Sequence, residues 1–168
     1  MKLSNDSVKE KLISKFGEQV YCFEEPYGML TFEAPKELNL KVLSFLYDDE
    51  SLQFTFLTAI CAVHYPDNKG KELAVVYHLF NLSANFRIRF KVFTAIATPD
   101  VYTATGIFAS ANWMERETFD FYGVNFIGHP NLIRILNVDE MDYFPMRKEF
   151  PLEDQTRVDK DDEMFGRG

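Results

Sequence analysis

The strictest constraint on the fold of this chain is the alternation of apolar and cationic side chains over residues 85–94. Apolar side chains hold every second position: Phe86, Ile88, Phe90 and Val92. Cations hold the positions between them: Arg87, Arg89 and Lys91. Because successive side chains of a strand point to opposite faces of a sheet, this period of two predicts a strand with one buried face. The buried face in turn requires a second layer that packs against it.

Four further segments have the composition of strands. Residues 52–65 form a long run rich in Phe, Thr, Ile and Val, and residues 72–82 form a second long apolar run. Residues 66–70 between them, PDNKG, predict a hairpin loop. Two shorter strand-like runs, 19–24 and 29–33, are divided by a Pro-Tyr-Gly turn. The sequence therefore predicts two short strands and then three long ones.

Three segments have the apolar spacing and end signals of helices. Ser4 or Asp6 can cap a first helix that ends near Gly17, and Pro35 can open a second one. A third helix is predicted over residues 101–121. The order helix, two strands, helix, three strands predicts an α+β fold, namely a two-layer domain with helices on one face of a mixed or antiparallel sheet.

The chain changes character after residue 136. Residues 139–168 hold ten acidic and five basic side chains, with hydrophobic side chains spaced among them. A segment of this kind buries too little apolar surface to fold alone and is typical of chain that orders on a partner. We therefore predict an α+β domain over residues 1–136, with a signature helix and loop at 111–136, and an extended partner-binding tail over 137–168.

Bulk composition argues against several classes of function. A net charge of −8 opposes broad binding to nucleic acid or to anionic lipid. Two cysteines without a CxxC pair cannot supply the four ligands that a zinc site or an iron–sulfur cluster usually needs. The N-terminus lacks a secretory h-region, and no apolar run reaches ~18 residues. We expect a cytoplasmic protein that contacts a membrane only through partners.

The cations of residues 85–94 allow two interpretations. Beside Phe86 and Phe90 they could belong to an RNA-binding sheet, on which bases stack against aromatic rings. In this strand, however, the aromatic and cationic side chains fall on opposite faces, whereas a stacking platform needs them together. The pattern favours a solvated or partner-facing cationic stripe.

The densest group of charged side chains lies at residues 113–123, WMERETFDFYG. On a helix, Glu117 and Asp120 share a face, where two carboxylates could bind a divalent cation or act as acid and base. Arg116 stands four positions before Asp120 and can pair with it. The alternative is that each carboxylate pairs with an arginine of this or another chain, such as Arg134 or Arg147. Because no nucleophile, phosphate loop or metal motif accompanies the carboxylates, catalysis is not favoured.

Two stretches of the sequence carry a resemblance to a known family. Residues 115–136, ERETFDFYGVNFIGHPNLIRIL, and residues 144–151, FPMRKEFP, form the pattern. They resemble the signature of the C subunit of proton-pumping NADH:quinone oxidoreductase, respiratory complex I, and the likeness extends over about residues 50–168. Members commonly have a second basic residue where Ile133 stands, and a histidine where Phe144 stands.

The resemblance implies a non-catalytic structural subunit of the peripheral arm, on the cytoplasmic side of the bacterial inner membrane. Such a protein packs chiefly against the hydrogenase-like D subunit, with the B and I subunits nearby. These partners, rather than this chain, would bind FMN, the iron–sulfur clusters and quinone, and would carry electrons from NADH to quinone. The chain itself would hold no catalytic, cofactor-binding or metal-binding residue. The signature residues would serve structure or interface: Glu115, Arg116, Glu117, Asp120, Gly123, His129, Pro130, Arg134, Arg147 and Lys148.

Some details of the expected function have alternatives. Asp120 and Arg134 are the best candidates for an internal or interfacial ion pair, and His129 in its Gly/Pro loop is expected to lock a turn. A protein of this kind could also serve a related membrane-bound hydrogenase or formate-oxidising complex. An alternative of a different class is a stand-alone metal-dependent hydrolase that uses Glu117 and Asp120.

Overall fold

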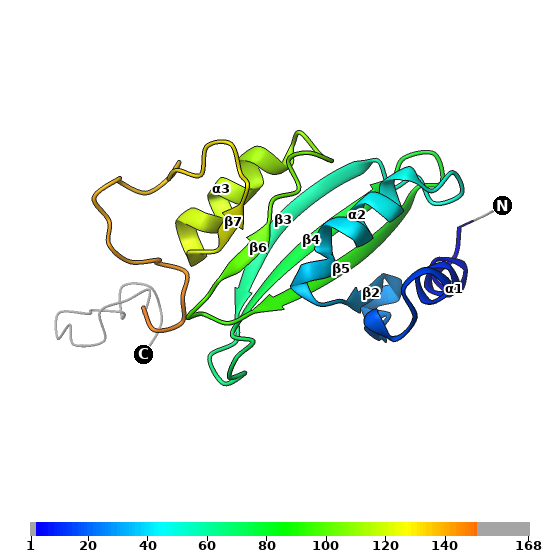
Figure 1. Cartoon of the computed structure of the whole chain (residues 1–168), viewed down its shortest axis with the longest axis horizontal. Coiled ribbons are helices and arrows are strands. Elements are labelled where there is room, and N and C mark those ends of the chain that lie inside the picture. The colour runs from blue at the N-terminus through cyan, green and yellow to red at the C-terminus, as the bar shows by residue number, and fades with distance from the viewer. Residues whose placement is uncertain (1–2, 151–168) are drawn as a thin grey trace, which may run out of the picture.

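The computed structural model describes residues 3–150, and its helices and strands follow the expected order as far as residue 94 (Figure 1). The α-helices are α1 (Asn5–Phe16), α2 (Asn39–Asp48) and α3 (Ala111–Tyr122). The strands are β1 (Tyr21–Glu24), β2 (Leu30–Glu33), β3 (Phe56–His64), β4 (Leu73–Asn81), β5 (Phe86–Thr94), β6 (Asp100–Tyr102) and β7 (Asn125–Ile127). Short 3-10 helices connect them: η1 (Gly17–Gln19), η2 (Pro26–Gly28) and η3 (Lys36–Leu38).

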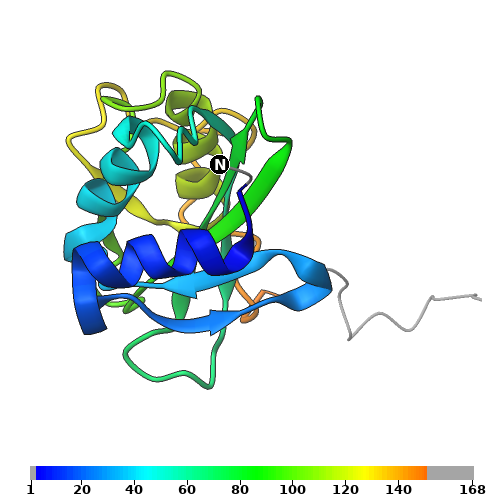
Figure 2. The same cartoon turned by 90° about the vertical axis from the view of Figure 1, so that its right-hand side faces the viewer.

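The main sheet has five strands in the order β1-β2-β5-β4-β3. The pair β2–β5 is parallel and the other pairs are antiparallel, so the sheet is mixed. Strands β6 and β7 form a separate parallel pair. Helices α1 and α2 lie over one face of the main sheet, and α3 packs along its outer strand, β3 (Figures 1 and 2). These findings confirm the predicted α+β class.

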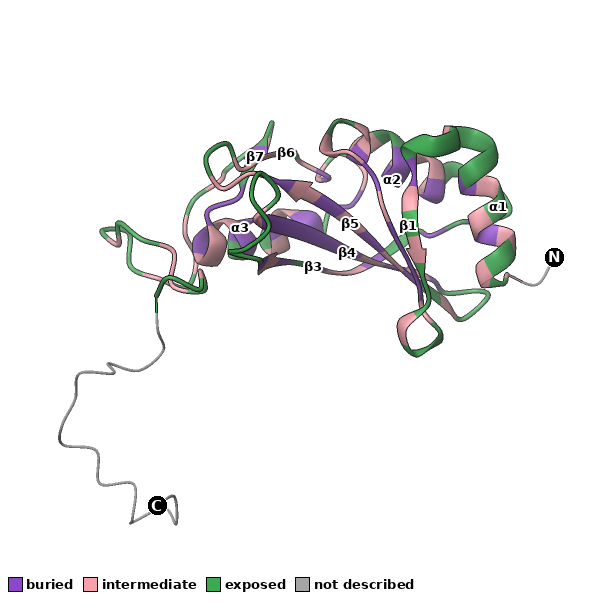
Figure 3. Ribbon diagram, turned by 90° about the horizontal axis from the view of Figure 1, so that it is seen from below, coloured by how far each residue is buried: buried purple, intermediate pink, exposed green. Residues whose placement is uncertain are grey.

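The alternation in β5 decides which face of the sheet is buried. Ile88, Phe90 and Val92 are fully buried, whereas the cations between them are half-buried or exposed (Figure 3). Aromatic rings continue the buried face across the sheet: Phe32 stacks on Phe90 at 5.0 Å between centroids, and Tyr77 stacks on the other side of Phe90 at 5.7 Å. Burial of these side chains is the main stabilising term for the two layers.

An ion pair from the middle of α1 to the C-terminal end of α2 joins the two helices in addition to the core. Ser4 caps α1 in a reciprocal box with Ser7, which fixes the start of the helix. Lys11 of α1 binds the Asp49 carboxylate at 2.8 Å, just after α2, and this bond helps to lower the pKa of Asp49 to about 2 although burial opposes the shift. The two helices therefore form one layer.

The helix predicted over residues 101–121 is wrong in its first half. Residues 100–102 form β6, which pairs with β7, and α3 begins only at Ala111. Thr103 and Ala104 after β6 both donate hydrogen bonds to Glu115 of α3, so this stretch folds back on the helix instead of extending it. The long strand predicted from residue 52 likewise begins at Phe56.

No helix within residues 3–150 is long and apolar enough to cross a membrane.

Candidate functional site

The signature region is organised around the buried carboxylate of Asp120, near the end of α3. Its Oδ2 accepts three backbone N–H bonds, from Ile135 at 3.1 Å, Leu136 at 2.8 Å and Asn137 at 3.0 Å. Its Oδ1 accepts from Arg134 Nη1 at 2.7 Å and from Asn137 Nδ2 at 3.0 Å. Successive N–H groups of the loop thus form a concave anion-binding nest around one carboxylate.

This carboxylate is charged although it is fully buried. Burial alone would raise the pKa of Asp120, but the hydrogen bonds from Asn137, Leu136 and Arg134 hold it well below its ordinary range. Charge-assisted hydrogen bonds of this kind are about twice as strong as neutral ones. The ion pair expected between Asp120 and Arg134 is present and lies inside the chain.

Arg134 extends the same network into the segment that follows. Its Nη2 donates to the backbone oxygens of Met141, at 2.8 Å, and Tyr143, at 3.0 Å. Its guanidinium also lies 5.2 Å from the centre of the Phe144 ring. One arginine therefore joins the end of α3 to residues 141–144.

The pairing of Arg116 with Asp120 that the helix spacing allows is not formed. Arg116 donates to the carbonyl oxygens of Ile133, at 3.1 Å, and Arg134, at 3.2 Å, and its guanidinium lies over the ring of Trp113. Asp120 already receives five hydrogen bonds from residues 134–137. Arg116 instead satisfies two carbonyl oxygens of the loop backbone. The helix spacing was compatible with the pair, but the loop backbone offered both side chains better partners.

Gly123 ends α3 and makes room for the next stretch of the chain. Its φ of +75° is the left-handed conformation in which glycine closes a helix. A Cβ at this position would clash with the Phe144 ring and the Arg147 guanidinium. Arg147 Nε donates to the Tyr122 carbonyl at 2.8 Å, and its guanidinium lies 4.5 Å from the centre of the Phe144 ring. A cation on the last carbonyls of a helix also complements the helix dipole.

The described part of the predicted tail, residues 137–150, contacts the domain of its own chain. Met146 donates its backbone N–H to Phe121, and Lys148 donates its own to His64 Nδ1 at 2.9 Å. The Lys148 side chain is exposed, so the described contact of this residue is made by its backbone. Residues 151–168 lie outside the described part of the chain, and the boundary at 136 and the partner-binding role of the tail stay predictions.

Glu115, in the second turn of α3, joins this helix to the residues just after β6. It is fully buried, and it accepts hydrogen bonds from Thr103 Oγ1 and from the backbone N–H of Ala104, the latter at 2.6 Å. Burial raises the pKa of Glu115 to about 7, and the two hydrogen bonds only partly oppose this rise. Glu115 thus differs from Asp120, since two donors are too few to compensate its desolvation.

Glu117 and Asp120 do not form a shared site. Glu117 is exposed on α3, whereas Asp120 is buried and its oxygens are occupied by donors of its own chain. Within residues 3–150 no three His, Cys, Asp or Glu side chains are grouped so as to hold a metal ion. This geometry gives no support to the metal-dependent hydrolase.

His129 bridges the loop after β7 to the start of α3. Its Nε2 lies 3.1 Å from the Asn112 carbonyl, and its Nδ1 accepts the Asn131 backbone N–H at 3.0 Å. A neutral ring with its proton on Nε2 satisfies both contacts. Pro130 follows as an exposed residue of the same loop.

Three residues of this network were missed from the sequence. Asn137 donates twice to Asp120, His64 anchors residue 148, and Phe144 fills the space between two arginines. Asn137 donates once through its backbone and once through its side chain, and the backbone bond leaves no signal in the sequence. The position of Phe144 was flagged as a departure from the family pattern, and that was the one available signal.

The space at Gly123 yields a prediction. Gly123→Ala adds a methyl group that collides with Phe144 and Arg147, so it will destabilise the chain by about 1–3 kcal/mol more than backbone strain alone. Gly28→Ala is the matched control, because Gly28 has a φ of +76° with no neighbouring atom within 4 Å of its Cβ position. Urea unfolding measures the difference, and amide exchange at Met146 will accelerate only in the Gly123 variant. Equal losses in both variants would contradict the crowding.

The raised pKa of Glu115 yields a second prediction, on pH dependence. The folded state keeps a proton up to about pH 7, whereas the unfolded carboxyl loses it near its ordinary pKa of 4.5. The free energy of unfolding therefore falls as pH rises through that window, by up to about 3 kcal/mol. Glu115→Gln keeps the acceptor for Ala104 and removes this loss. Urea titrations of both proteins at roughly pH 5 and pH 8 test it, and parallel pH profiles would refute it.

Comparison with known proteins identifies the family of the chain. The family model described as "Respiratory-chain NADH dehydrogenase, 30 Kd subunit" matches residues 32–156. The chain is 43% identical to the C subunit of NADH-quinone oxidoreductase from Azorhizobium caulinodans, over 82% of this chain and 64% of that protein. It is 42% identical to the C subunit from a Nocardioides species, over 74% of this chain and 50% of that protein. The chain thus spans between half and about two thirds of the length of these relatives.

Solved structures show the same fold. A trypsin-resistant fragment of Nqo5 superimposes with a TM-score of 0.65 at 30% identity, covering 76% of this chain and 98% of the fragment. A chain of the membrane-bound sulfane sulfur reductase, an archaeal respiratory membrane complex, superimposes with a TM-score of 0.73 at 23% identity, over 88% of this chain and 85% of that one, which is a likeness of fold alone. The chain therefore belongs to the family of the 30 kDa subunit of respiratory-chain NADH dehydrogenase, which includes the bacterial C subunits of NADH-quinone oxidoreductase.

Proposed function

We propose that this chain is a non-catalytic structural subunit of the peripheral arm of a proton-translocating NADH:quinone oxidoreductase. It would support electron transfer from NADH to quinone through its partner subunits, which would bind FMN, the iron–sulfur clusters and quinone. The hydrogenase-like D subunit is the proposed main contact, with the B and I subunits nearby, on the cytoplasmic side of the bacterial inner membrane. Contact with the membrane would come through the assembled complex.

The observation that carries this proposal is how the charged signature residues are used. Glu115, Asp120 and Arg134 form hydrogen bonds within the chain, and these bonds hold α3, its loop and residues 141–147 in one arrangement. Rigid internal bonding of this kind suits a surface that must keep its shape while partners dock on it. A catalytic use would instead leave such groups facing a substrate space.

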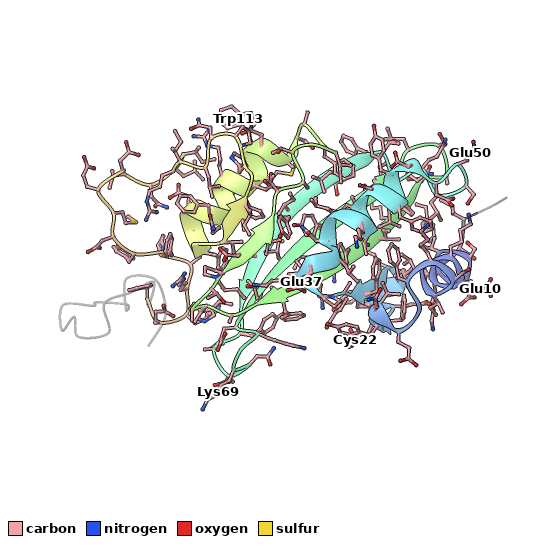
Figure 4. The ribbon with its side chains drawn as sticks, viewed as in Figure 1. Glu10, Cys22, Glu37, Glu50, Lys69 and Trp113 are labelled. Carbon is pink, nitrogen blue, oxygen red and sulfur yellow. The ribbon has the colours of Figure 1, made fainter. Side chains whose placement is uncertain are left out.

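The same region exposes apolar side chains that a partner could cover. They stand on α3 and along the segment that Asp120 and Arg134 hold: Trp113, Ile133, Leu136, Val138, Tyr143, Met146 and Phe150. Trp113 projects from the upper edge of the molecule (Figure 4). Aromatic and aliphatic anchors of this type dominate the binding energy of protein interfaces. We infer that this surface, the signature surface, is the main contact with the D subunit.

Loss of the Asp120 carboxylate tests the structural role. Asp120→Ala leaves Arg134 and three backbone N–H groups without their acceptor, a loss of about 3–5 kcal/mol for a buried pair. We expect less assembled complex, with normal NADH:quinone turnover per complex that does assemble. Asp67→Ala removes an exposed carboxylate from the β3–β4 hairpin and serves as the control. Normal abundance with collapsed turnover would overturn the structural role.

The exposed apolar side chains give a sharper test of the surface itself. Leu136→Ser alters a side chain that is 63% exposed, so the stability of the isolated chain should stay within ~0.5 kcal/mol. We expect the tagged variant to retain less of its companion subunits in a gentle affinity purification. Leu82→Ser is the matched control, because Leu82 is 62% exposed but lies in the β4–β5 turn. Unchanged retention in the Leu136 variant would exclude this residue from the interface.

The equivalent subunit of a related membrane-bound hydrogenase or formate-oxidising complex is the alternative. The same purification separates the two, since the companion subunits identified by mass spectrometry differ. Flavin and iron–sulfur absorbance with NADH oxidation favours the respiratory enzyme; hydrogen or formate oxidation favours the alternative.

A further inference from the structure

A second candidate surface lies on the other face of the main sheet. Because Ile88, Phe90 and Val92 point into the core, the cations between them point away from α1 and α2. The strand register continues this face onto the neighbouring strands, with the half-buried His78 opposite Arg89 on β4 and the buried Thr31 opposite it on β2. We call Arg87, Arg89 and Lys91 the cationic row.

The cationic row is unsatisfied within residues 3–150. None of its three side chains forms an ion pair there, and Arg89 Nε is buried without a hydrogen-bond partner. A buried donor without an acceptor is costly, so an acceptor supplied from outside would be stabilising. The Arg87 guanidinium lies 5.0 Å from the centre of the Phe80 ring of β4, which holds the side chain against the sheet.

The neighbours of the row narrow the class of ligand. Glu33 stands opposite Lys91 on β2, Glu24 stands on β1, and Glu117 stands on α3. With a net charge of −8, these carboxylates repel an extended polyanion such as nucleic acid or an anionic membrane. The row is thus a narrow cationic strip that fits a few carboxylates rather than a charged polymer.

The spacing of the row matches one kind of partner. Alternate residues of a strand stand about 6.6–6.8 Å apart on one face, and an extended partner repeats its side chains at the same interval. The forked donors of two arginines suit carboxylates in particular, because they can bind them with two parallel hydrogen bonds. His78 adds little charge, because burial and then Arg89 and Arg87 lower its pKa.

An apolar recess adjoins the row across β4 and β3. It has a volume of about 300 Å³ and lies between β3, α3 and the following segment. Its lining is mostly apolar: Ile60, Cys61, Phe121, Tyr122 and Met146, with Glu117 at its margin. Cys61 connects the recess to the row through the strand register, because it stands opposite Val76 of β4 and Val76 stands opposite Lys91 of β5. A single aliphatic or aromatic side chain suits such a space.

We propose that the cationic row and the adjoining recess dock an extended acidic segment of a neighbouring subunit, with carboxylates on the row and one apolar side chain in the recess. This inference rests on the proposed function, because the partner is a companion subunit of the complex. It adds a second contact, which meets the signature surface at Met146. The partner segment has acidic side chains at alternate positions and an aromatic or aliphatic residue at one end.

Zero-length carbodiimide cross-linking of the assembled complex tests this proposal. The reagent joins an amine to a carboxylate in direct contact, so Lys91 should link to an Asp or Glu of a companion subunit. Combined Arg87→Gln and Arg89→Gln should reduce that product roughly tenfold and make retention of the companion more sensitive to salt. Lys69→Gln with Lys71→Gln, in the β3–β4 hairpin at the lower edge of Figure 4, is the matched control and should change neither. Cys61→Phe, which fills the recess, should lower retention by itself.

Several outcomes would overturn the proposal. The first is that Lys91 forms cross-links only to Glu33, to acidic residues within 151–168 or to a second copy of this chain. The second is that Lys91 forms no cross-link at all. The third is that the chain retains nucleic acid in a way that depends on the cationic row. In each case the proposed function stands if retention of the companion subunits still depends on Asp120. If no companion subunits are retained by the wild-type chain, the proposed function and this inference both fail. Urea unfolding of each variant distinguishes lost contact from lost folding.

Discussion

The arrangement of α3 and of the segment that follows it depends on one buried negative charge. Asp120 is ionised in a place without solvent, and five donors from residues 134–137 surround it. A charge buried without partners would cost several kcal/mol, so α3 and its loop have a single favourable arrangement. Arg134, held by that carboxylate, then fixes Met141 and Tyr143. The charged residues of the signature therefore act first on the shape of their own chain.

Because the charged signature residues bond within the chain, other residues form its exposed surfaces. Around α3 and its loop, the side chains that remain exposed are largely apolar, including Trp113 and Leu136. On the open face of the sheet they are cationic. A protein that supplies shape to a larger assembly needs surfaces that differ in chemistry, because each partner must recognise its own and no other. The cationic row lies on a strand of the core, whereas most of the signature surface lies on the segment held by Asp120 and Arg134.

The sequence predicted the elements that have their own periodicity. The alternation at 86–92 identified β5 and its buried face, and the end signals at Ser4 and Gly17 bounded α1. The stretch at 101–110 was wrongly assigned to a helix. Its turn is held by the contact of Thr103 with Glu115, and a tertiary contact of this kind leaves no local pattern in the sequence. The pairing of Asp120 with Arg134 could be inferred from charge. The nest around Asp120 could not, because backbone N–H groups carry no mark in a sequence.

The parallel pairing of β2 with β5 sets the order in which the chain can fold. β2 ends at Glu33, but its neighbour on the inner side of the sheet begins only at Phe86. More than fifty residues must therefore leave the ribosome before β1 and β2 gain that neighbour. Contacts of such long sequence separation form late and slowly. During synthesis the β1–β2 hairpin therefore has an unpaired hydrogen-bonding edge on β2. Nascent-chain chaperones would bind at this edge.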